Sequence, residues 1–261
     1  MMMKLDSPYR ILLLGGTTEA TSLAQSLAGE NGVSATLSLA GRTVNPAASP
    51  LPVRIGGFGG VDALTEYLTR ENIDLIVDAT HPFAARISNN AIAASAAAQI
   101  PLLAIERPPW TPANGDNWNE YDSIDTAIAA LPDTPQNVFS GLGRQAIAAL
   151  SVAPQHRYVI RVVDASEPPA SLPQATIVAA RGPFRTEDDL ELFRKHRISH
   201  VLAKNSGGSA AYSKIEAAGV LGIKVHMVRR PAIAPRSTVA SVEYALAWIK
   251  THHQRRSERG V

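Results

Sequence analysis

A phosphate-binding turn is indicated by four consecutive residues, Gly15, Gly16, Thr17 and Thr18. They separate an apolar run at 11–14 from a segment with helical periodicity. Glycine permits a sharp turn and lets a phosphate approach the backbone amides, and the start of a helix adds N–H groups and a positive dipole end. The third glycine of the usual dinucleotide fingerprint is absent. A tight strand-to-helix turn with a capping threonine explains the same residues, so this segment alone leaves both interpretations open.

An arginine at position 42 favours a phosphorylated dinucleotide. Arg42 follows the second apolar run, 27 positions after Gly15 (42 − 15 = 27). An acidic residue near this place would accept the ribose hydroxyls of NAD, whereas an arginine suits the 2′-phosphate of NADPH. Taken by itself, Arg42 is equally explained as a surface residue of a loop.

Two further segments of the first half follow apolar runs. The loop "GGFGG" at 56–60, which includes Gly57, suggests close approach of the backbone to a flat or charged group, with a flexible loop as the alternative. The run at 74–78 ends in Asp78, and Thr80, His81 and Pro82 follow it. We expect Pro82 at the first position of a helix, which biases His81 away from helical geometry and leaves its ring free to face a ligand.

Cationic side chains occupy the corresponding places in the second half. In open α/β sheets ligands bind beyond the carboxyl ends of the strands, so residues after each apolar run are the candidates. Here they include "SGLGR", "RVVD", "ARGPF" and "KNSGG", beginning at 140, 161, 180 and 204. The pattern favours a cofactor on the glycine-rich side and an anionic substrate on the cationic side of a cleft.

Short apolar runs alternate with helical patterns along the chain, which is typical of parallel sheets covered by helices. The expected strands are 10–14, 33–39, 52–55, 74–78, 101–105, 137–140, 157–163, 176–180, 200–204 and 223–228. The expected helices are 17–28, 60–70, 83–98, 143–151, 186–196, 209–218 and 238–250.

The sequence divides into two halves with matching spacing. Gly56 lies 41 positions after Gly15 and Gly182 lies 41 after Gly141 (56 − 15 and 182 − 141). We therefore expect two Rossmann-like α/β domains with parallel sheets and an active-site cleft between them. The expected bounds are 1–107 for the first, 119–235 for the second and 108–118 for a Pro-rich linker, with the helix 238–250 packing on the first domain.

Composition restricts the functional class. The chain has 261 residues, 45% of them hydrophobic and 18% charged, with a formal net charge of +2. It has no cysteine, which excludes disulfides and thiolate chemistry. Scattered cations and the lack of a long apolar run argue against nucleic acid and membrane partners. These features predict a cytoplasmic protein with a small-molecule substrate; the oligomeric state stays open, and a monomer is compatible with the sequence.

The ordered set of motifs resembles the precorrin-6A reductase family of cobalamin biosynthesis. The carrying segments are "LLLGGTTEA" at 12–20, "AGR" at 40–42, "GGFGG" at 56–60, "DATHPFA" at 78–84, "ERPPW" at 106–110, and the four second-half motifs named above. The resemblance implies reduction of one double bond of precorrin-6A to give precorrin-6B, with hydride from NADPH to C19 and a proton to C18. It implies two α/β domains and no metal in the protein.

The resemblance also assigns roles to residues. The NADPH phosphates are expected at Gly15, Gly16, Thr17, Thr18 and Arg42. Gly57, Asp78, Thr80, His81 and Pro82 are expected at the cofactor, the last four near the nicotinamide. The substrate carboxylates are expected at Arg144, Arg161, Arg181, Arg185, Lys204 and Ser206. The candidates for proton transfer are His81, Asp164, Lys204 and ordered water.

Two other functions are weighed against this one. A short-chain dehydrogenase needs Tyr-x-x-x-Lys, and none of the six tyrosines has a lysine four positions later. A non-catalytic NADP(H)-binding sensor would keep the glycine turn and Arg42 without needing the second set of cations. The sequence has neither the G-x-S-x-G motif of hydrolases nor the G-x-x-x-x-G-K-[ST] motif of NTPases, so these functions have no support.

Overall fold

The computed structural model describes residues 8–41, 47–113 and 115–259, with side chains described as far as residue 254. The chain forms two compact units, which are described separately below. Unit 1 comprises residues 1–107 and 232–261, and unit 2 comprises residues 108–231. In the described ranges no helix is both long enough and apolar enough to cross a membrane.

Unit 1 contains a six-stranded parallel sheet, here sheet A, in the order β12-β5-β4-β1-β2-β3. Read from β3, this is the strand order 3-2-1-4-5-6 of dinucleotide-binding folds. Its strands are β1 (Tyr9–Leu14), β2 (Val33–Leu39), β3 (Val53–Ile55), β4 (Leu75–Asp78), β5 (Leu102–Ile105) and β12 (Ser237–Val239). Its helices are α1 (Thr18–Leu27), α2 (Val61–Arg70), α3 (Ala85–Ala98) and α8 (Val242–Arg259).

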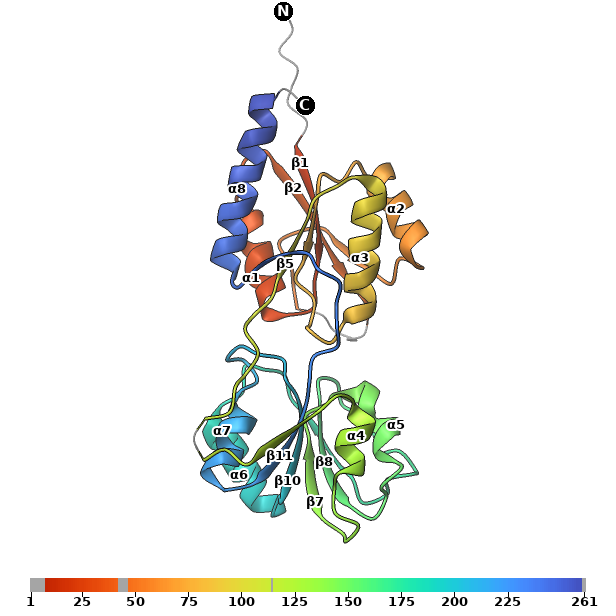
Figure 1. The fold of residues 1–261 in the computed structure, drawn as a ribbon, viewed down its shortest axis with the longest axis vertical. Helices are drawn as coiled ribbons and strands as arrows, with labels where there is room; N and C mark the ends of the chain where they lie inside the picture. Colours follow the sequence, from red (N-terminus) through yellow and green to blue (C-terminus); the bar gives the residue numbers. More distant parts are fainter. Residues whose placement is uncertain (1–7, 42–46, 114, 260–261) are drawn as a thin grey trace, which may run out of the picture. The chain divides into compact units, whose positions relative to one another are not determined.

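Helices cover both faces of sheet A, with α1 and α8 on one face and α2 and α3 on the other (Figure 1). Strand β1 supplies both cores because its side chains alternate. Ile11 and Leu13 pack in the cluster that includes α1 and α8, and Leu12 and Leu14 pack in the cluster that includes α2 and α3. All four are almost fully buried. A central parallel strand therefore appears in the sequence as a continuous apolar run.

Unit 2 contains a second six-stranded parallel sheet, sheet B, in the order β6-β11-β10-β7-β8-β9. Its strands are β6 (Trp118–Tyr121), β7 (Asn137–Ser140), β8 (Arg157–Val162), β9 (Thr176–Ala179), β10 (His200–Lys204) and β11 (Lys224–Val228). Its helices are α4 (Ile124–Ala129), α5 (Ile147–Leu150), α6 (Thr186–His196) and α7 (Ser213–Val220), and a 3₁₀ turn η1 (Arg144–Ala146) precedes α5.

The two sheets share one strand order but complete it differently. In sheet A the sixth place is taken by β12, which returns from the C-terminal part of the chain and pairs with β5. In sheet B it is taken by β6, which precedes the first strand β7 in sequence and pairs with β11. Figure 1 shows α6 and α7 on one face of sheet B and α4 and α5 on the other. The expectation of parallel Rossmann-like sheets is confirmed.

Three local expectations differ from the structure. The helix expected at 238–250 begins later, at Val242, because residues 237–239 pair with β5 as strand β12. The strand at 118–121 and the helix at 124–129 were not expected, since the first is defined by pairing with the distant β11. Residues 108–118, expected as a linker, belong to unit 2, where Trp110 is buried in the core.

Candidate functional site

The first strand-to-helix turn of unit 1 is packed so closely that glycine is required at position 15. A Cβ atom on Gly15 would lie 2.5 Å from Leu37 Cδ1 of the neighbouring strand β2. Gly16 has a φ of +119°, a backbone conformation that residues other than glycine rarely adopt. A Cβ atom on Gly16 would meet no described atom within 4 Å. The backbone of this turn therefore borders open space, as a ligand approaching the main chain requires.

Thr17 fixes the start of α1. Its Oγ1 accepts a hydrogen bond from the backbone N–H of Ala20 at 3.2 Å and donates one to the carbonyl of Ala79 at 2.7 Å. A hydroxyl has one proton, and in this geometry the proton of Thr17 is already donated. The Thr17 side chain thus fixes the start of the helix through both of these bonds.

A partly buried ion pair lies beside this helix start. The Glu19 carboxylate accepts from Nη1 of Arg107 at 2.8 and 2.7 Å and from the hydroxyl of the exposed Thr18 at 3.0 Å. Burial raises the pKa of Glu19, but the hydrogen bonds and charge of Arg107 outweigh it and lower the pKa below its usual value. Arg107 balances the negative charge of Glu19, so the helix start keeps a field that attracts anions. The sequence did not indicate this pair, although Glu19 lies in the motif at 12–20 and Arg107 in the motif at 106–110.

The glycine-rich loop 56–60 is held by Arg54, another residue missed from the sequence. The guanidinium of Arg54 donates to the carbonyls of Gly56 at 2.5 Å and Gly57 at 2.9 Å, and it lies 3.8 Å from the ring centroid of Phe58. A Cβ atom on Gly56 or Gly57 would meet no described atom within 4 Å. The loop is therefore shaped by the protein itself and still presents open backbone.

Asp78 ends β4 directly beside the last residue of β1, Leu14. The side chain is buried, and its Oδ1 accepts from the backbone N–H of Thr80 at 3.1 Å and from the Thr80 hydroxyl at 2.7 Å. Thr80 Oγ1 also lies 3.3 Å from the hydroxyl of Ser88 in α3. The fold thus brings together the segments after β1 and β4, and Asp78 organises the second of them.

His81 and Pro82 lie in a turn ahead of α3. The His81 residue is exposed, and its Nδ1 accepts from the backbone N–H of Phe83 at 3.2 Å. The helix begins at Ala85, so the expectation that Pro82 occupies its first position was wrong. The reason is a turn closed by the hydrogen bond from Ala84 N to His81 O at 2.7 Å. Arg42, the residue expected at a 2′-phosphate, lies outside the described residues.

In unit 2 the predicted substrate residues differ in exposure. Arg144, Arg181 and Arg185 are exposed, and Arg185 makes only a surface pair with Glu187 at 3.5 Å. Such a pair contributes little to stability and leaves the guanidinium accessible to solvent. All three side chains are therefore in contact with solvent.

The other predicted polar residues of unit 2 are less exposed. Lys204 is the half-buried last residue of β10, and the buried Ser206 donates its backbone N–H to the Lys204 carbonyl at 2.7 Å. Asp164 is half-buried and lies two positions after β8 ends at Val162. Lys204 thus ends its strand, and Ser206 and Asp164 each lie two positions beyond a strand end.

Arg161 has a structural partner that the sequence did not indicate. Its guanidinium forms an ion pair with the fully buried Asp189 of α6 and lies 4.8 and 4.3 Å from the ring centroids of Phe139 and Phe184. Asp189 also accepts from the Ser213 hydroxyl at 2.6 Å. The ion pair thus joins sheet B to α6, and contact of Arg161 with a substrate stays a prediction.

Asn205 joins "KNSGG" to "ERPPW". Its buried amide accepts from the backbone N–H of Trp110 at 2.8 Å and donates to the Trp110 carbonyl at 2.9 Å. Trp110 in turn donates its indole N–H to the carbonyl of Gly208 at 2.7 Å. Arg230 donates to the carbonyls of Asn205 and Ser206 at 2.9 and 3.1 Å. The loop after β10 is thus held from two sides, a role that the sequence motifs did not indicate.

Lys214 is the second residue missed in this region. It is buried, its ammonium lies 4.8 Å from the ring centroid of Trp110, and it donates to the carbonyl of Ala211. Burial and the charge of Arg161 lower the pKa of Lys214 to about 7, against the opposing charge of Asp189. A Cβ atom on Gly141 would lie 3.1 Å from the Lys214 stem, so glycine follows β7 because the lysine needs that space.

Two parallel sheets in the dinucleotide-binding order, with a glycine turn after the first strand, define a Rossmann-like α/β protein. Residues 10–250 match the family Precorrin-6x reductase CbiJ/CobK, and the chain belongs to this family. The family resemblance expected from the sequence is thereby confirmed.

Relatives extend the comparison. The precorrin-6A reductase of Rhodobacter capsulatus is 49% identical over 243 residues, 93% of this chain and 96% of that protein. A solved structure of a CobK precorrin-6A reductase has a TM-score of 0.88 and 49% identity, covering 93% of this chain and 96% of its own. A more distant relative, the cobalt-precorrin-6A reductase of Priestia megaterium, is 29% identical over 90% of this chain and 97% of that protein.

Proposed function

We propose that the protein reduces precorrin-6A to precorrin-6B in cobalamin biosynthesis, with NADPH as the hydride donor. The observation that carries this proposal is the 49% identity with a precorrin-6A reductase across nearly the whole of both chains. Higher identity with this relative than with the cobalt-precorrin-6A reductase, at 49% against 29%, supports a cobalt-free substrate.

Unit 1 has the features that NADPH binding requires. Open backbone at Gly16 and Gly57 lets phosphate and sugar groups approach closely, and the start of α1 supplies a field that favours anions. In our proposal Gly15, Gly16 and Thr18 bind the pyrophosphate, Thr17 positions the helix, and Arg42 binds the 2′-phosphate. When bound, NADPH supplies the hydride.

The segment after β4 is proposed to lie near the nicotinamide. Asp78 and Thr80 keep this segment in one conformation through their mutual hydrogen bonds. His81 and Pro82, in the turn that follows, would limit the space available to the ring. A well-fixed backbone here serves the reaction because hydride transfer depends on orientation more than on a protein nucleophile.

Unit 2 has the charge that a polycarboxylate macrocycle requires. The exposed Arg144, Arg181 and Arg185 and the half-buried Lys204 are proposed to bind acetate and propionate groups, with Ser206 beside them. The hydride is proposed to reach C19 and the proton C18 of the macrocycle. His81, Asp164, Lys204 and ordered water remain the candidates for the proton donor.

Anaerobic mixing of the protein, NADPH and precorrin-6A tests the proposal. We expect nicotinamide absorbance to be lost together with a shift in the macrocycle spectrum. Tight NADPH binding without turnover would instead favour the non-catalytic sensor. A parallel reaction with cobalt-precorrin-6A separates the two substrates, since faster turnover of the cobalt form would contradict the cobalt-free assignment.

A further inference from the structure

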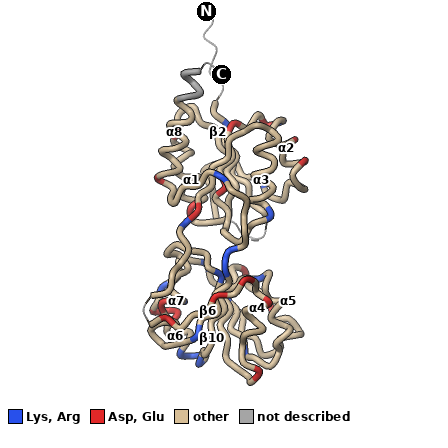
Figure 2. Tube along the Cα trace, in the orientation of Figure 1, with Lys and Arg blue, Asp and Glu red and all other residues tan. Residues whose placement is uncertain are grey.

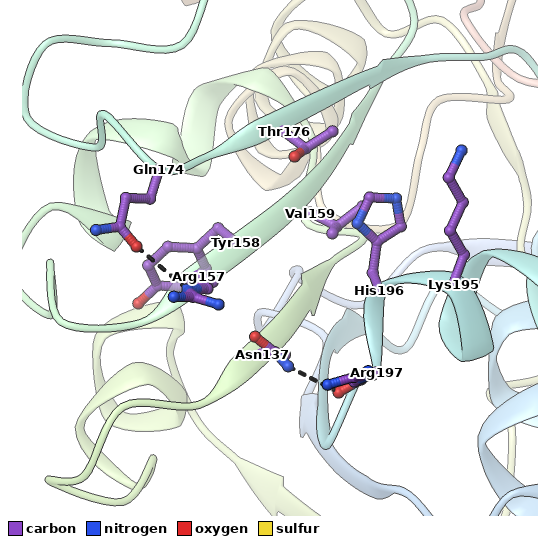
Figure 3. Close-up of a pocket in the computed structure, with 9 residues that line it drawn as sticks. All are labelled: Asn137, Arg157, Tyr158, Val159, Gln174, Thr176, Lys195, His196 and Arg197. Atoms are coloured by element: carbon purple, nitrogen blue, oxygen red, sulfur yellow. Dashed lines mark hydrogen bonds between the residues drawn. The ribbon is translucent and has the colours of Figure 1, made fainter.

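A charged pocket lies in unit 2, at the amino ends of its strands. The cavity has a volume of about 320 Å³ and is lined by the first residues of β7, β8 and β9, which are Asn137, Arg157 and Thr176. The end of α6 closes it from the other side (Figure 3). The predicted substrate residues lie at the carboxyl ends of the strands, so this pocket is at the opposite end of the strands of sheet B.

The lining of the pocket is cationic. Arg157, Lys195 and Arg197 carry permanent charges, His196 adds an ionisable ring, and the lining contains no acidic residue. Over the described part of the chain, none of the three permanent cations forms a salt bridge. The net charge of the whole protein is only +2, so this concentration of charge is local.

Helix stabilisation explains only part of this concentration. The last turn of α6 carries Arg194, Lys195 and His196, and cations there complement the helix dipole. Lys and Arg residues are drawn in blue near α6 in Figure 2. Arg157 is different, because it begins strand β8 and has no place in that helix. It lines the same cavity as Lys195 and Arg197, so helix stabilisation does not account for its place there.

The neutral groups of the pocket orient the cations. Gln174 accepts from Nε of Arg157 at 3.3 Å, so that the terminal nitrogens of Arg157 remain as donors. Asn137 donates to the carbonyl of Arg197 at 3.1 Å and fixes the main chain at the end of α6. The guanidinium of Arg157, held in this way, can bind carboxylate or phosphate oxygens in a bidentate manner.

We propose that this pocket is a binding site for a small anion with two or more carboxylate or phosphate groups, separate from the catalytic site. Its volume, about 320 Å³, is at the lower end of the range for small-molecule sites. One charged group of the ligand would bind Arg157, and the other would bind Lys195 and Arg197.

Calorimetric titration of the full-length protein tests the site, with pyrophosphate and tricarballylate as separate probes at about 150 mM NaCl to screen diffuse attraction. We expect saturable binding of at least one probe, with Kd below about 1 mM. Preference for pyrophosphate would identify a phosphate ligand and preference for tricarballylate a carboxylate ligand. The double variant Arg157→Gln/Arg197→Gln should weaken binding at least about tenfold.

Arg194→Gln is the matched control, because Arg194 lies in the same last turn of α6 but does not line the pocket. It should change Kd less than about twofold. Thermal unfolding without ligand checks that both variants fold. No saturable binding of either probe by the unmodified protein would overturn the proposal, as would equal weakening by Arg194→Gln and by the double variant.

Discussion

The hydroxyl of Thr17 donates a hydrogen bond to the carbonyl of Ala79 at 2.7 Å. This bond links the start of α1 to the residue that follows β4, so the glycine turn and the segment containing Asp78 and Thr80 are held together. One side chain therefore positions both parts of the proposed NADPH site. Its effect on the cofactor is expected to be indirect, through the geometry of the backbone.

Thr17→Val should lower stability and weaken NADPH together. The variant keeps the shape of the side chain but loses the helix cap and the bond to Ala79, at a cost of about 1–2 kcal/mol. Thermal unfolding and the KM for NADPH are the measurements. Thr17→Ser keeps the hydroxyl and should preserve both values.

Thr18→Val gives the contrast to Thr17→Val. The only hydrogen bond described for the Thr18 side chain is to Glu19 on the surface, so the melting temperature should change little. If Thr18 binds the pyrophosphate, the KM for NADPH still rises. A large loss of stability in Thr18→Val, or an unchanged melting temperature in Thr17→Val, would contradict this division of roles.

Arg42→Ala should separate the two nicotinamide cofactors. Loss of a guanidinium–phosphate contact should raise the KM for NADPH by at least about tenfold and change that for NADH by less than about twofold. Steady-state kinetics with each cofactor provide the measurement, and Arg70→Ala, at the exposed end of α2, is a surface control. An equal rise in KM for both cofactors would contradict the assignment of Arg42 to the 2′-phosphate.

Asn205→Asp should destabilise unit 2 in a pH-dependent way. The substitution removes the donor to the Trp110 carbonyl and places a buried carboxylate beside it, at a cost of about 2–4 kcal/mol near neutral pH. At lower pH the difference in unfolding free energy between the variant and the unmodified protein should become smaller. The protonated carboxyl of the variant can again donate to the Trp110 carbonyl. Unfolding followed by tryptophan fluorescence at several pH values measures this difference. A difference that does not change with pH would exclude a buried carboxylate as its cause.

His226 should make the protein less stable in acid. Burial, with smaller contributions from the charges of His200 and Lys224, lowers the pKa of His226 from 6.5 to about 4. The unfolded chain therefore binds a proton that the folded chain does not between these pH values, and stability falls as pH drops from about 6.5 to 4.

The variant His226→Phe tests the assignment. It keeps an aromatic ring against Tyr121, whose ring lies stacked on His226 with a centroid distance of 5.5 Å. Melting temperatures measured across this pH range should fall less steeply in the variant than in the unmodified protein. Equal slopes would show that other groups control the acid sensitivity.

Much of the fold could be read from local patterns. Runs such as 11–14 and 201–203 are buried on both faces and apolar, which indicated parallel strands. The glycine turn, the Asp78 segment and the cations of the second half were predicted as ligand sites because such sites follow the carboxyl ends of parallel strands, and that assignment stays a prediction. Strands β12 and β6 were not expected because each is defined by pairing with a distant segment, which local patterns do not indicate.

Sequence by itself determined the class of protein, because periodicity, glycine turns and ordered motifs are local properties of the chain. Tertiary structure alone decided what individual polar groups do. The ion pair of Arg161 with Asp189 joins two elements and could not be seen from the sequence. Thr17, Asn205 and Lys214 acquired their roles in the same way, since a hydrogen bond or a shifted pKa depends on neighbours that only folding brings together.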